Sequence, residues 1–542
     1  MKILLRIIFA IQILFVSSTP ATSAPQGMTY RNPIIHADYS DPDVVASPNG
    51  KTFYLTASSF QCTPGLPILK STDLVNWELV NYAIKAVPPA EVYTGISQHG
   101  NGVWAPSIRY HNGEYYIYWG DPDFGIFMVK SSDPEGEWSE PVLVKGGKGL
   151  IDTTPLWDDD GKAYLVNGWA NSRIGFNNIL TISEMNPDGT SLISEPTIVF
   201  DGNDGVNFTV EGPKLYKKDG FYYIFAPAGG VAQGWQLAMR SKNIMGPYEV
   251  RKVMEQGNSD INGPHQGGWV TDANGEDWFL HFQDKDMYGR VLHLNPMTWK
   301  DGWPVIGMDE DGDGIGEPVR TYPAPKLVNN VNSPFITPEN ITKHFQWHSN
   351  YDVSYGFPSA NSLMRLYGHK ILNDTINLWD VPNLWLMKFP EEEFTFTSDI
   401  TVSSKTISEG ASSGVVIMGR NYCRLGLTSY KEGFILQYVT NEHADSQGLE
   451  NIKDITLLKP SRNYSAGNLS NMEISLSIRV KVNKEGKCTF SYSLDGKKYT
   501  DLPYVFQASE GRWIGAKIGF YSITPSTVNN KGWIDINKIS ID

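Results

Sequence analysis

The sequence predicts an all-β protein, a five-bladed β-propeller followed by a β-sandwich. Short segments with a proline beside a polar or small residue recur about every fifty residues in the first part of the chain. Each leads to a Gly- or Asp-containing turn and then to an aromatic-rich strand, which is typical of a propeller with one four-stranded sheet per blade. The five openings are Asp41-Pro42, Ala105-Pro106, Asp152-Thr153-Thr154-Pro155, Glu211-Gly212-Pro213 and Gly263-Pro264-His265.

The repeats divide the chain into blades and a second domain. The aromatic-rich strands are 52–55, 114–118, 163–166, 221–225 and 277–280. They place the blades at about 41–80, 103–144, 151–200, 210–250 and 262–306. From residue 345 the openings stop, and longer alternating strands indicate a β-sandwich. The predicted domains are a propeller over 25–322, a linker over 323–344 and a sandwich over 345–542.

The N-terminus indicates export. Lys2 and Arg6 precede a mostly apolar run, and the small residues of 21–24 follow it. This pattern predicts a secretory signal peptide over residues 1–24, and hence a periplasmic or secreted protein. The apolar run is too short to span a bilayer, so no membrane insertion is expected.

Charge and cysteine content narrow the choice of partners. The formal net charge is −14, which argues against nucleic acid and anionic membranes, favours a neutral or cationic ligand and aids solubility. The chain has three cysteines, Cys62, Cys423 and Cys488, which fit neither a zinc spacing nor a disulfide scaffold. Cys423 and Cys488 lie in the same region, so they either pair or remain free.

Residues far apart in the chain are expected to meet at one mouth of the propeller. The first strand of each blade lines the central channel, so equivalent positions of the repeats converge there. These positions hold Asp41, Asp152, Glu211 and His265. Three carboxyl groups and one imidazole at the end of a funnel form a candidate site for acid/base chemistry.

The chain resembles the family 43 glycoside hydrolases over about residues 30–322. The resemblance rests on motifs that match in order and in blade position: Asn32-Pro33, Ser40-Asp41-Pro42-Asp43, Gly102-Val103-Trp104-Ala105-Pro106, Ile151-Asp152 with Asp158-Asp159-Asp160-Gly161, and Glu211-Gly212-Pro213. The C-terminal part is similar to the sandwich of β-xylosidase and α-L-arabinofuranosidase members, at Asn377-Leu378-Trp379-Asp380-Val381-Pro382-Asn383-Leu384.

The resemblance implies an inverting glycosidase with three carboxylate roles. Inverting hydrolysis needs a general base and a general acid roughly 6.5–9.5 Å apart, with room for a water. Asp41 matches the base and Glu211 matches the acid, which must be protonated near neutral pH. Asp152 matches the pKa modulator, whose charge keeps the proton on the acid and which orients it. Taken singly, each carboxylate is more often a turn residue, but the position that they share within the repeats favours catalysis.

The resemblance also implies substrate-binding residues. Arg290 matches an arginine that contacts the terminal sugar, and the alternative is a surface arginine. Trp104 is expected to form an apolar wall for the sugar, with Phe60, Trp169 and Trp235 as weaker candidates, while simple packing is the alternative for each. His265 matches a histidine that holds a structural calcium ion through water, or else is a hydrogen-bonded core residue. The chemistry itself requires no cofactor.

An acidic stretch, Asp309-Glu310-Asp311-Gly312-Asp313-Gly314, begins like an EF-hand calcium loop. Its twelfth position, where a glutamate is expected, is Arg320. We therefore interpret the stretch as an acidic turn.

Together these observations predict an exo-acting glycosidase that removes single pentoses from plant cell-wall glycans or their xylo- or arabino-oligosaccharides. A β-1,4-xylosidase is favoured, because the sandwich resembles those whose loop closes one end of the pocket. An α-L-arabinofuranosidase is the main alternative. An endo-arabinanase needs an open groove, and a non-catalytic sugar-binding propeller has no use for a separated acid and base.

Overall fold

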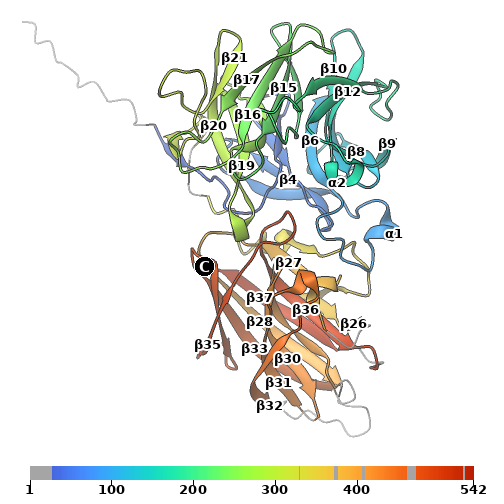
Figure 1. The fold of residues 1–542 in the computed structure, drawn as a ribbon. Coiled ribbons are helices and arrows are strands. Elements are labelled where there is room, and N and C mark those ends of the chain that lie inside the picture. Colours follow the sequence, from blue (N-terminus) through green and yellow to red (C-terminus); the bar gives the residue numbers. More distant parts are fainter. Residues whose placement is uncertain are drawn as a thin grey trace, which may run out of the picture.

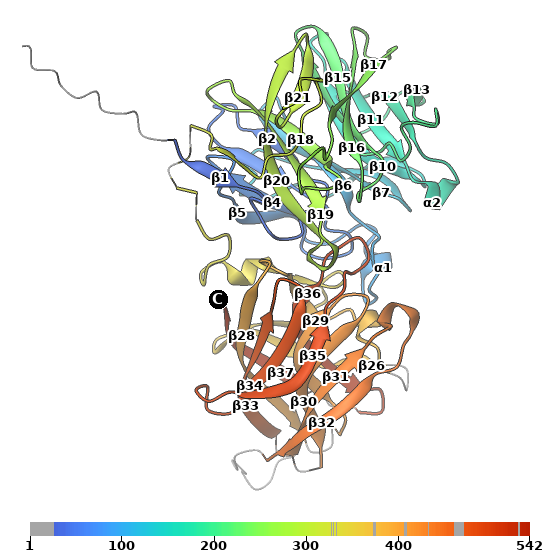
Figure 2. The same ribbon diagram turned by 60° about the vertical axis from the view of Figure 1, so that its left-hand side comes forward.

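The computed structural model describes residues 27–326, 328, 330–331, 333–371, 376–405, 409–431, 433–459, 471–528 and 532–542. It confirms a nearly all-β chain with a five-bladed propeller followed by a sandwich. Figure 1 and Figure 2 show the propeller above the sandwich. The predicted signal peptide, residues 1–24, lies outside the described residues.

Each blade is a four-stranded antiparallel sheet whose strands follow chain order. Blade one comprises β2 (Asp43–Ala46), β3 (Phe53–Thr56), β4 (Gly65–Ser71) and β5 (Glu78–Ile84). Blade two comprises β6 (Trp104–His111), β7 (Glu114–Asp121), β8 (Gly125–Ser131) and β9 (Val142–Gly146). Blade three comprises β10 (Leu150–Trp157), β11 (Ala163–Trp169), β12 (Ile179–Met185) and β13 (Thr197–Asp201). Blade four comprises β14 (Lys214–Lys218), β15 (Phe221–Ala228), β16 (Trp235–Ser241) and β17 (Glu249–Met254). Blade five comprises β18 (His265–Thr271), β19 (Asp277–Asp284), β20 (Arg290–Lys300) and β21 (Trp303–Ile306).

Aromatic residues of the second strands fill the space within and between blades. Trp119 on β7 is fully buried and stacks on Phe127 of β8 with ring centroids 5.5 Å apart. Phe225 on β15 packs on Phe279 of the neighbouring blade at 6.0 Å. The aromatic-rich strands therefore form the core of the propeller, because large rings bury much apolar surface per residue.

The ring of blades is closed by the segment before blade one. β1 (Thr29–Arg31) pairs with β22 (Thr321–Pro323), which follows blade five. Asn32, buried next to β1, donates from Nδ2 to the carbonyls of Leu294 (2.7 Å) and Val319 (2.8 Å). Its Oδ1 accepts from the Leu294 amide at 2.9 Å. Asn32 thus ties the N-terminal lead to the last blade, which gives the Asn32-Pro33 motif a structural role.

The C-terminal domain packs two antiparallel sheets face to face. One sheet has the order β23 (Phe345–Trp347), β27 (Trp385–Lys388), β36 (Lys517–Pro525), β29 (Ser412–Met418), β30 (Tyr422–Tyr430), β31 (Gly433–Asn441), β32 (Asn451–Leu458), with β26 (His369–Ile371) parallel to β36. The other has the order β24 (Gly356–Ser359), β25 (Ser362–Tyr367), β37 (Trp533–Ile541), β28 (Phe394–Lys405), β33 (Asn471–Val482), β34 (Lys487–Ser493), β35 (Thr500–Gln507). Their inner faces share one large apolar core.

Helices in the described chain are short. They are α1 (Ala90–Tyr93), α2 (Asn171–Ile174) and the 3₁₀ turns η1 (Asp286–Tyr288), η2 (Ile341–His344), η3 (Leu378–Asp380) and η4 (Ala444–Ser446). None of these described helices has the length and apolar character needed to cross a bilayer. Cys62, Cys423 and Cys488 are buried and free.

The sandwich docks directly on the propeller. Thr63 of blade one and Trp347 of β23 exchange two backbone hydrogen bonds, of 2.6 and 3.2 Å. On the other side, the amide of Gly515 donates to Asp38 Oδ2 at 3.1 Å. The second contact brings the loop between β35 and β36 to the channel mouth, where the candidate site lies.

Candidate active site

Each blade places a residue with left-handed backbone near the start of its first strand. These residues are Asp41 (φ 55°), Ala105 (φ 35°), Asp152 (φ 57°), Gly212 (φ 58°) and Gln266 (φ 40°). Positive φ is uncommon for residues other than glycine, and such strain clusters at functional sites. The pattern corrects the predicted equivalence of the openings. Glu211 and His265 lie one residue before the left-handed position, whereas Asp41 and Asp152 occupy it.

These openings surround a cavity of about 240 Å³. The volume is below the roughly 300–1,000 Å³ that is usual for drug-sized ligands, so the cavity suits a small unit such as a single sugar. Asp41, Asp152 and Glu211 all line it. The structure therefore brings the three predicted carboxyl groups together, although the chain separates them widely.

The Asp41 carboxylate is buried and held by two donors. Ser58 Oγ donates to its Oδ2 at 2.6 Å, and Arg290 donates from a terminal guanidinium nitrogen to its Oδ1 at 3.0 Å. The side chain of Asp41 is 9% exposed, at the cavity wall. Charge-assisted bonds of this kind fix the orientation of a carboxylate, and the remaining lone pairs are available to a water molecule in the cavity.

Asp152 and Glu211 form a pair of unequal exposure. Asp152 is buried, and its Oδ2 accepts the Gly212 amide at 2.8 Å. Burial and the neighbouring Glu211 raise the pKa of Asp152 to about 8. The two carboxyl groups therefore retain a proton at neutral pH, because like charges at one site disfavour full ionisation. The Glu211 side chain is 33% exposed, so it is the member of the pair that can contact a substrate.

The structure gives Asp152 a raised pKa that the sequence does not indicate. The sequence predicts a charged Asp152 that keeps a proton on Glu211. In the structure Asp152 is the more deeply buried of the two, and desolvation favours its neutral form. Gly212, between them in space, has left-handed φ and no room for a side chain, because a Cβ there would lie 2.5 Å from Gln266.

His265 is hydrogen-bonded to Glu211. Its Nε2 lies 3.1 Å from Glu211 Oε1, and its buried Nδ1 has no hydrogen-bond partner among the described residues. The free nitrogen could serve as one ligand, but calcium prefers six to eight oxygens. The described residues around the ring offer no cluster of three ligand-bearing side chains. The calcium ion remains a prediction, and the contact with Glu211 was not expected.

Three of the four predicted substrate-binding residues line the cavity, namely Phe60, Trp104 and Arg290. The fourth, Trp169, does not. Its indole donates to Thr181 Oγ1 at 3.1 Å and packs with blade three. Trp235, the other candidate, packs edge to face on Phe208 and is also outside the cavity lining.

Sequence reasoning missed Trp513, a residue of the sandwich. It lines the cavity, is 49% exposed and lies edge to face with Trp104 at 6.4 Å and 70°. Its φ of 65° is left-handed. The loop is clamped by Asp38, which accepts from the amides of Gly515 (3.1 Å) and Arg290 (3.0 Å). The only sequence signal is a tryptophan in a glycine-containing loop.

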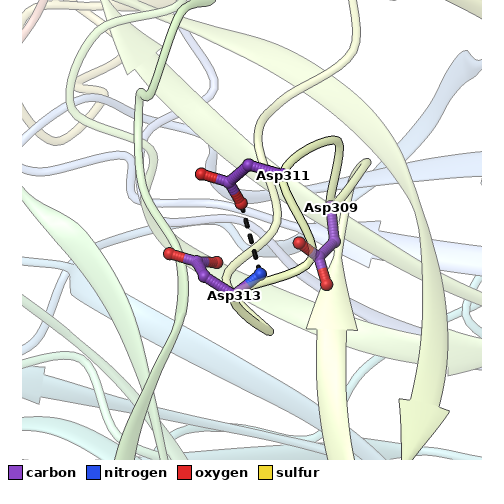
Figure 3. A group of neighbouring side chains, drawn as sticks. All are labelled: Asp309, Asp311 and Asp313. Carbon is purple, nitrogen blue, oxygen red and sulfur yellow. Dashed lines mark hydrogen bonds between the residues drawn. The ribbon is translucent and has the colours of Figure 1, made fainter.

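The acidic stretch in blade five's exit loop lies apart from this cavity. Asp309, Asp311 and Asp313 place one carboxylate oxygen each within 4.8 Å of one another (Figure 3). Their oxygens cap nearby amides, as in Asp309 Oδ1 with Gly312 at 2.8 Å. Such bonds are those of an acidic turn.

Comparison with known proteins follows the two domains. Residues 30–304 match the family described as "Glycosyl hydrolases family 43", and residues 335–541 match the "Beta xylosidase C-terminal Concanavalin A-like domain". A β-xylosidase from Formosa agariphila is 30% identical over 95% of this chain and 90% of its own. A non-reducing end α-L-arabinofuranosidase from Bacteroides ovatus is 31% identical over 56% of this chain and 57% of its own. In fold, the chain is similar to a xylan β-1,4-xylosidase from Bacillus halodurans, with a TM-score of 0.78 over 95% of this chain and all of that one at 20% identity.

Proposed function

Because this chain belongs to glycosyl hydrolase family 43, we propose that it is a secreted, inverting exo-β-1,4-xylosidase. The observation that carries the proposal is the cavity of about 240 Å³ in which three carboxyl groups meet under Trp513 of the sandwich. A small cavity closed on one side by a second domain suits a chain end and excludes a continuing polymer. The β-xylosidase from Formosa agariphila is similar over both domains, which supports the xyloside specificity.

In the proposed mechanism Asp41 is the general base. A water molecule between Asp41 and the sugar would give its proton to this carboxylate and attack the anomeric carbon. Arg290 and Ser58 hold Asp41 in place while the charge changes. Arg290 also lines the cavity, so the same guanidinium can bind a hydroxyl of the terminal sugar.

Glu211 is the proposed general acid. Its exposure lets it deliver the shared proton to the glycosidic oxygen, while buried Asp152 remains behind it. His265, at 3.1 Å from Glu211, and the Gly212 amide on Asp152 restrict the positions of the two groups. The proton that the pair retains to about pH 8 is thus the one that the leaving sugar needs.

The similarity of the propeller to an α-L-arabinofuranosidase favours that activity as the second candidate. A panel of aryl pentosides, assayed with purified protein, separates the two. Turnover of the β-xyloside well above that of the α-L-arabinofuranoside is expected, with the product released as the opposite anomer. Preference for the arabinofuranoside would assign the second activity, and no turnover of any pentoside would reject both.

A further inference from the structure

A thiol and an amine meet at the interface of the two domains. Cys62, in the blade-one loop that follows Phe60, is 1% exposed. Lys517, the first residue of β36, is 4% exposed, and its Nζ lies 2.8 Å from Cys62 Sγ. For comparison, the hydrogen bond from Cys488 Sγ to the Gly486 carbonyl is 3.4 Å long. The sulfur and nitrogen are therefore closer than an ordinary sulfur hydrogen bond of this protein.

The surroundings of Lys517 leave the thiol as its partner. Among the described residues, Cys62 Sγ is the hydrogen-bond acceptor found for the Lys517 Nζ. Burying a lysine without a carboxylate or a carbonyl is costly. Lys388, directly opposite on β27, adds a second buried amine whose pKa burial lowers to about 8. The Lys517 Nζ that faces the sulfur is therefore placed to act as a nucleophile once it has given up a proton.

The thiol lies in the same loop as a residue of the cavity wall. Gln61 precedes Cys62 and is fully buried, yet its Nε2 has no hydrogen-bond partner among the described residues. Phe60, one residue earlier, lines the cavity. Hydrogen peroxide that enters the cavity would therefore meet the loop that carries Cys62.

We propose that Cys62 and Lys517 are a redox modification site, at which peroxide drives a covalent crosslink between the propeller and the sandwich. The sulfur of the Cys62 thiol attacks one oxygen of hydrogen peroxide and the O–O bond breaks; the thiol proton leaves with the released hydroxide as water, which gives the sulfenic acid. The uncharged Lys517 amine then attacks the sulfenic sulfur. An S–N bond forms, the S–O bond breaks, and the hydroxyl leaves with the amine proton as a second water. Sulfur is oxidised by two electrons and one peroxide is reduced.

The crosslink would join the two walls of the cavity. It would tie the loop that carries Phe60 to β36, the strand that follows the Trp513 loop. Phe60 and Trp513 both line the cavity. Tethering them restricts opening of the domains, so the oxidised protein should unfold at a higher temperature. This inference does not depend on which sugar is hydrolysed.

The other two cysteines of the chain serve as controls. Cys423 and Cys488 are buried in the sandwich core. Burial raises the pKa of the Cys488 thiol to about 12 and that of Cys423 still further, so both remain thiols and resist peroxide. A Cys423→Ser variant should crosslink like the parent. Cys62→Ser and Lys517→Met should not crosslink.

The experiment treats the purified full-length protein with hydrogen peroxide and reads intact mass and peptide maps. The expected product has lost two hydrogens, yields one joined peptide pair containing Cys62 and Lys517, melts at a higher temperature, and returns to the parent mass with dithiothreitol. A joined pair that has also gained one oxygen would support the same site with an oxygen bridge. Sulfinic acid at Cys62, or an unmodified Cys62, with Lys517 in a free peptide would overturn the proposal. The parent protein alone decides this, even if a variant fails to fold.

Discussion

Asp41 and Asp152 combine a left-handed backbone with a buried carboxyl group. A turn aspartate needs neither burial nor a partner from a distant part of the chain. Asp41, however, is bound by Arg290, which belongs to the last blade of the propeller. Strain of this kind persists only where the surrounding structure holds it. The two residues therefore act as fixed groups of the site and not as turn residues.

Replacing Asp41 by asparagine should remove the base and leave the fold. The change is nearly isosteric, and an amide oxygen can still accept from Ser58 or Arg290. General-base catalysis contributes roughly 10²–10⁴-fold, so kcat/KM should fall by that factor while Tm stays close to the parent. Steady-state kinetics and thermal melting check this. Activity within about tenfold of the parent would contradict the assigned role.

Replacing Glu211 by alanine should reduce activity by a factor that depends on the leaving group of the substrate. A sugar alkoxide must be protonated as it leaves, whereas a dinitrophenolate is stable as an anion. The variant should lose several orders of magnitude on a xylo-oligosaccharide and far less on the activated aryl xyloside. The same preparation serves both assays, which controls for misfolding. Equal losses on the two substrates would mean that Glu211 is not the acid.

Asp152→Asn should change two pH profiles. The alkaline limb of kcat/KM should move to lower pH, because Glu211 loses the neighbour with which it shares a proton.

The pH dependence of the unfolding free energy should change as well. The native pKa of about 8 lies above the unfolded value of about 3.9, so the native state binds more protons between these values. This group therefore lowers the parent's stability as pH rises through that window.

The stability of the Asp152→Asn variant relative to the parent should accordingly increase from about pH 4 to pH 8. Denaturant unfolding at several pH values measures it. A difference in unfolding free energy that is independent of pH would show that Asp152 titrates normally.

At the scale of elements, the loop between β35 and β36 completes a cavity that the propeller leaves open. Trp513 faces Trp104 across the mouth, and Asp38 fixes both this loop and the backbone of Arg290. One buried carboxylate thus connects a wall of the cavity to the residue that holds Asp41.

Trp513→Ala should weaken binding of the sugar more than it slows the chemistry. Truncating an aromatic wall typically costs more than about 1 kcal/mol, so KM should rise about tenfold with a smaller change in kcat. Polymeric xylan should become a relatively better substrate as the mouth widens. Trp169→Ala is the matched control, because Trp169 lies outside the cavity and should leave KM unchanged. If the two substitutions changed KM by the same factor, Trp513 would not be a substrate-binding residue.

At the scale of the whole molecule, the apolar core of the sandwich extends into the propeller. Tyr288 and Val291 of the propeller belong to the apolar cluster that fills the sandwich. The hydroxyl of Tyr288, close to Arg290 in the chain, also donates to the carbonyl of Glu392 at 2.7 Å. The sandwich therefore supports the segment that positions Arg290.

A chain that ends at Pro325 should fold poorly or lose most of its activity. Removing the sandwich exposes Tyr288 and Val291 and leaves the segment that carries Arg290 without its support. Soluble yield and kcat/KM, compared with the full chain made in parallel, measure the effect. Full solubility with parent activity would make the sandwich an independent module and would remove the basis for the exo mode.

The sequence by itself determined the fold and most of the site. Proline-carboxylate openings with a period near fifty residues indicate blades, and blades converge on one channel, so Asp41, Asp152 and Glu211 could be placed together. Period and turn chemistry are local properties, which a sequence shows directly. Arg290, Trp104 and Phe60 could be named through the resemblance to family 43, and all three line the cavity.

Only the tertiary structure decided the rest. Trp513 comes from another domain, and no periodicity relates it to the blades. Trp169 falls outside the cavity because its indole bonds to Thr181 in its own blade. The pKa of Asp152 is raised because distant segments pack around it and remove it from water. Burial, docking and pair distances depend on how distant segments pack, and a linear pattern carries no record of that packing.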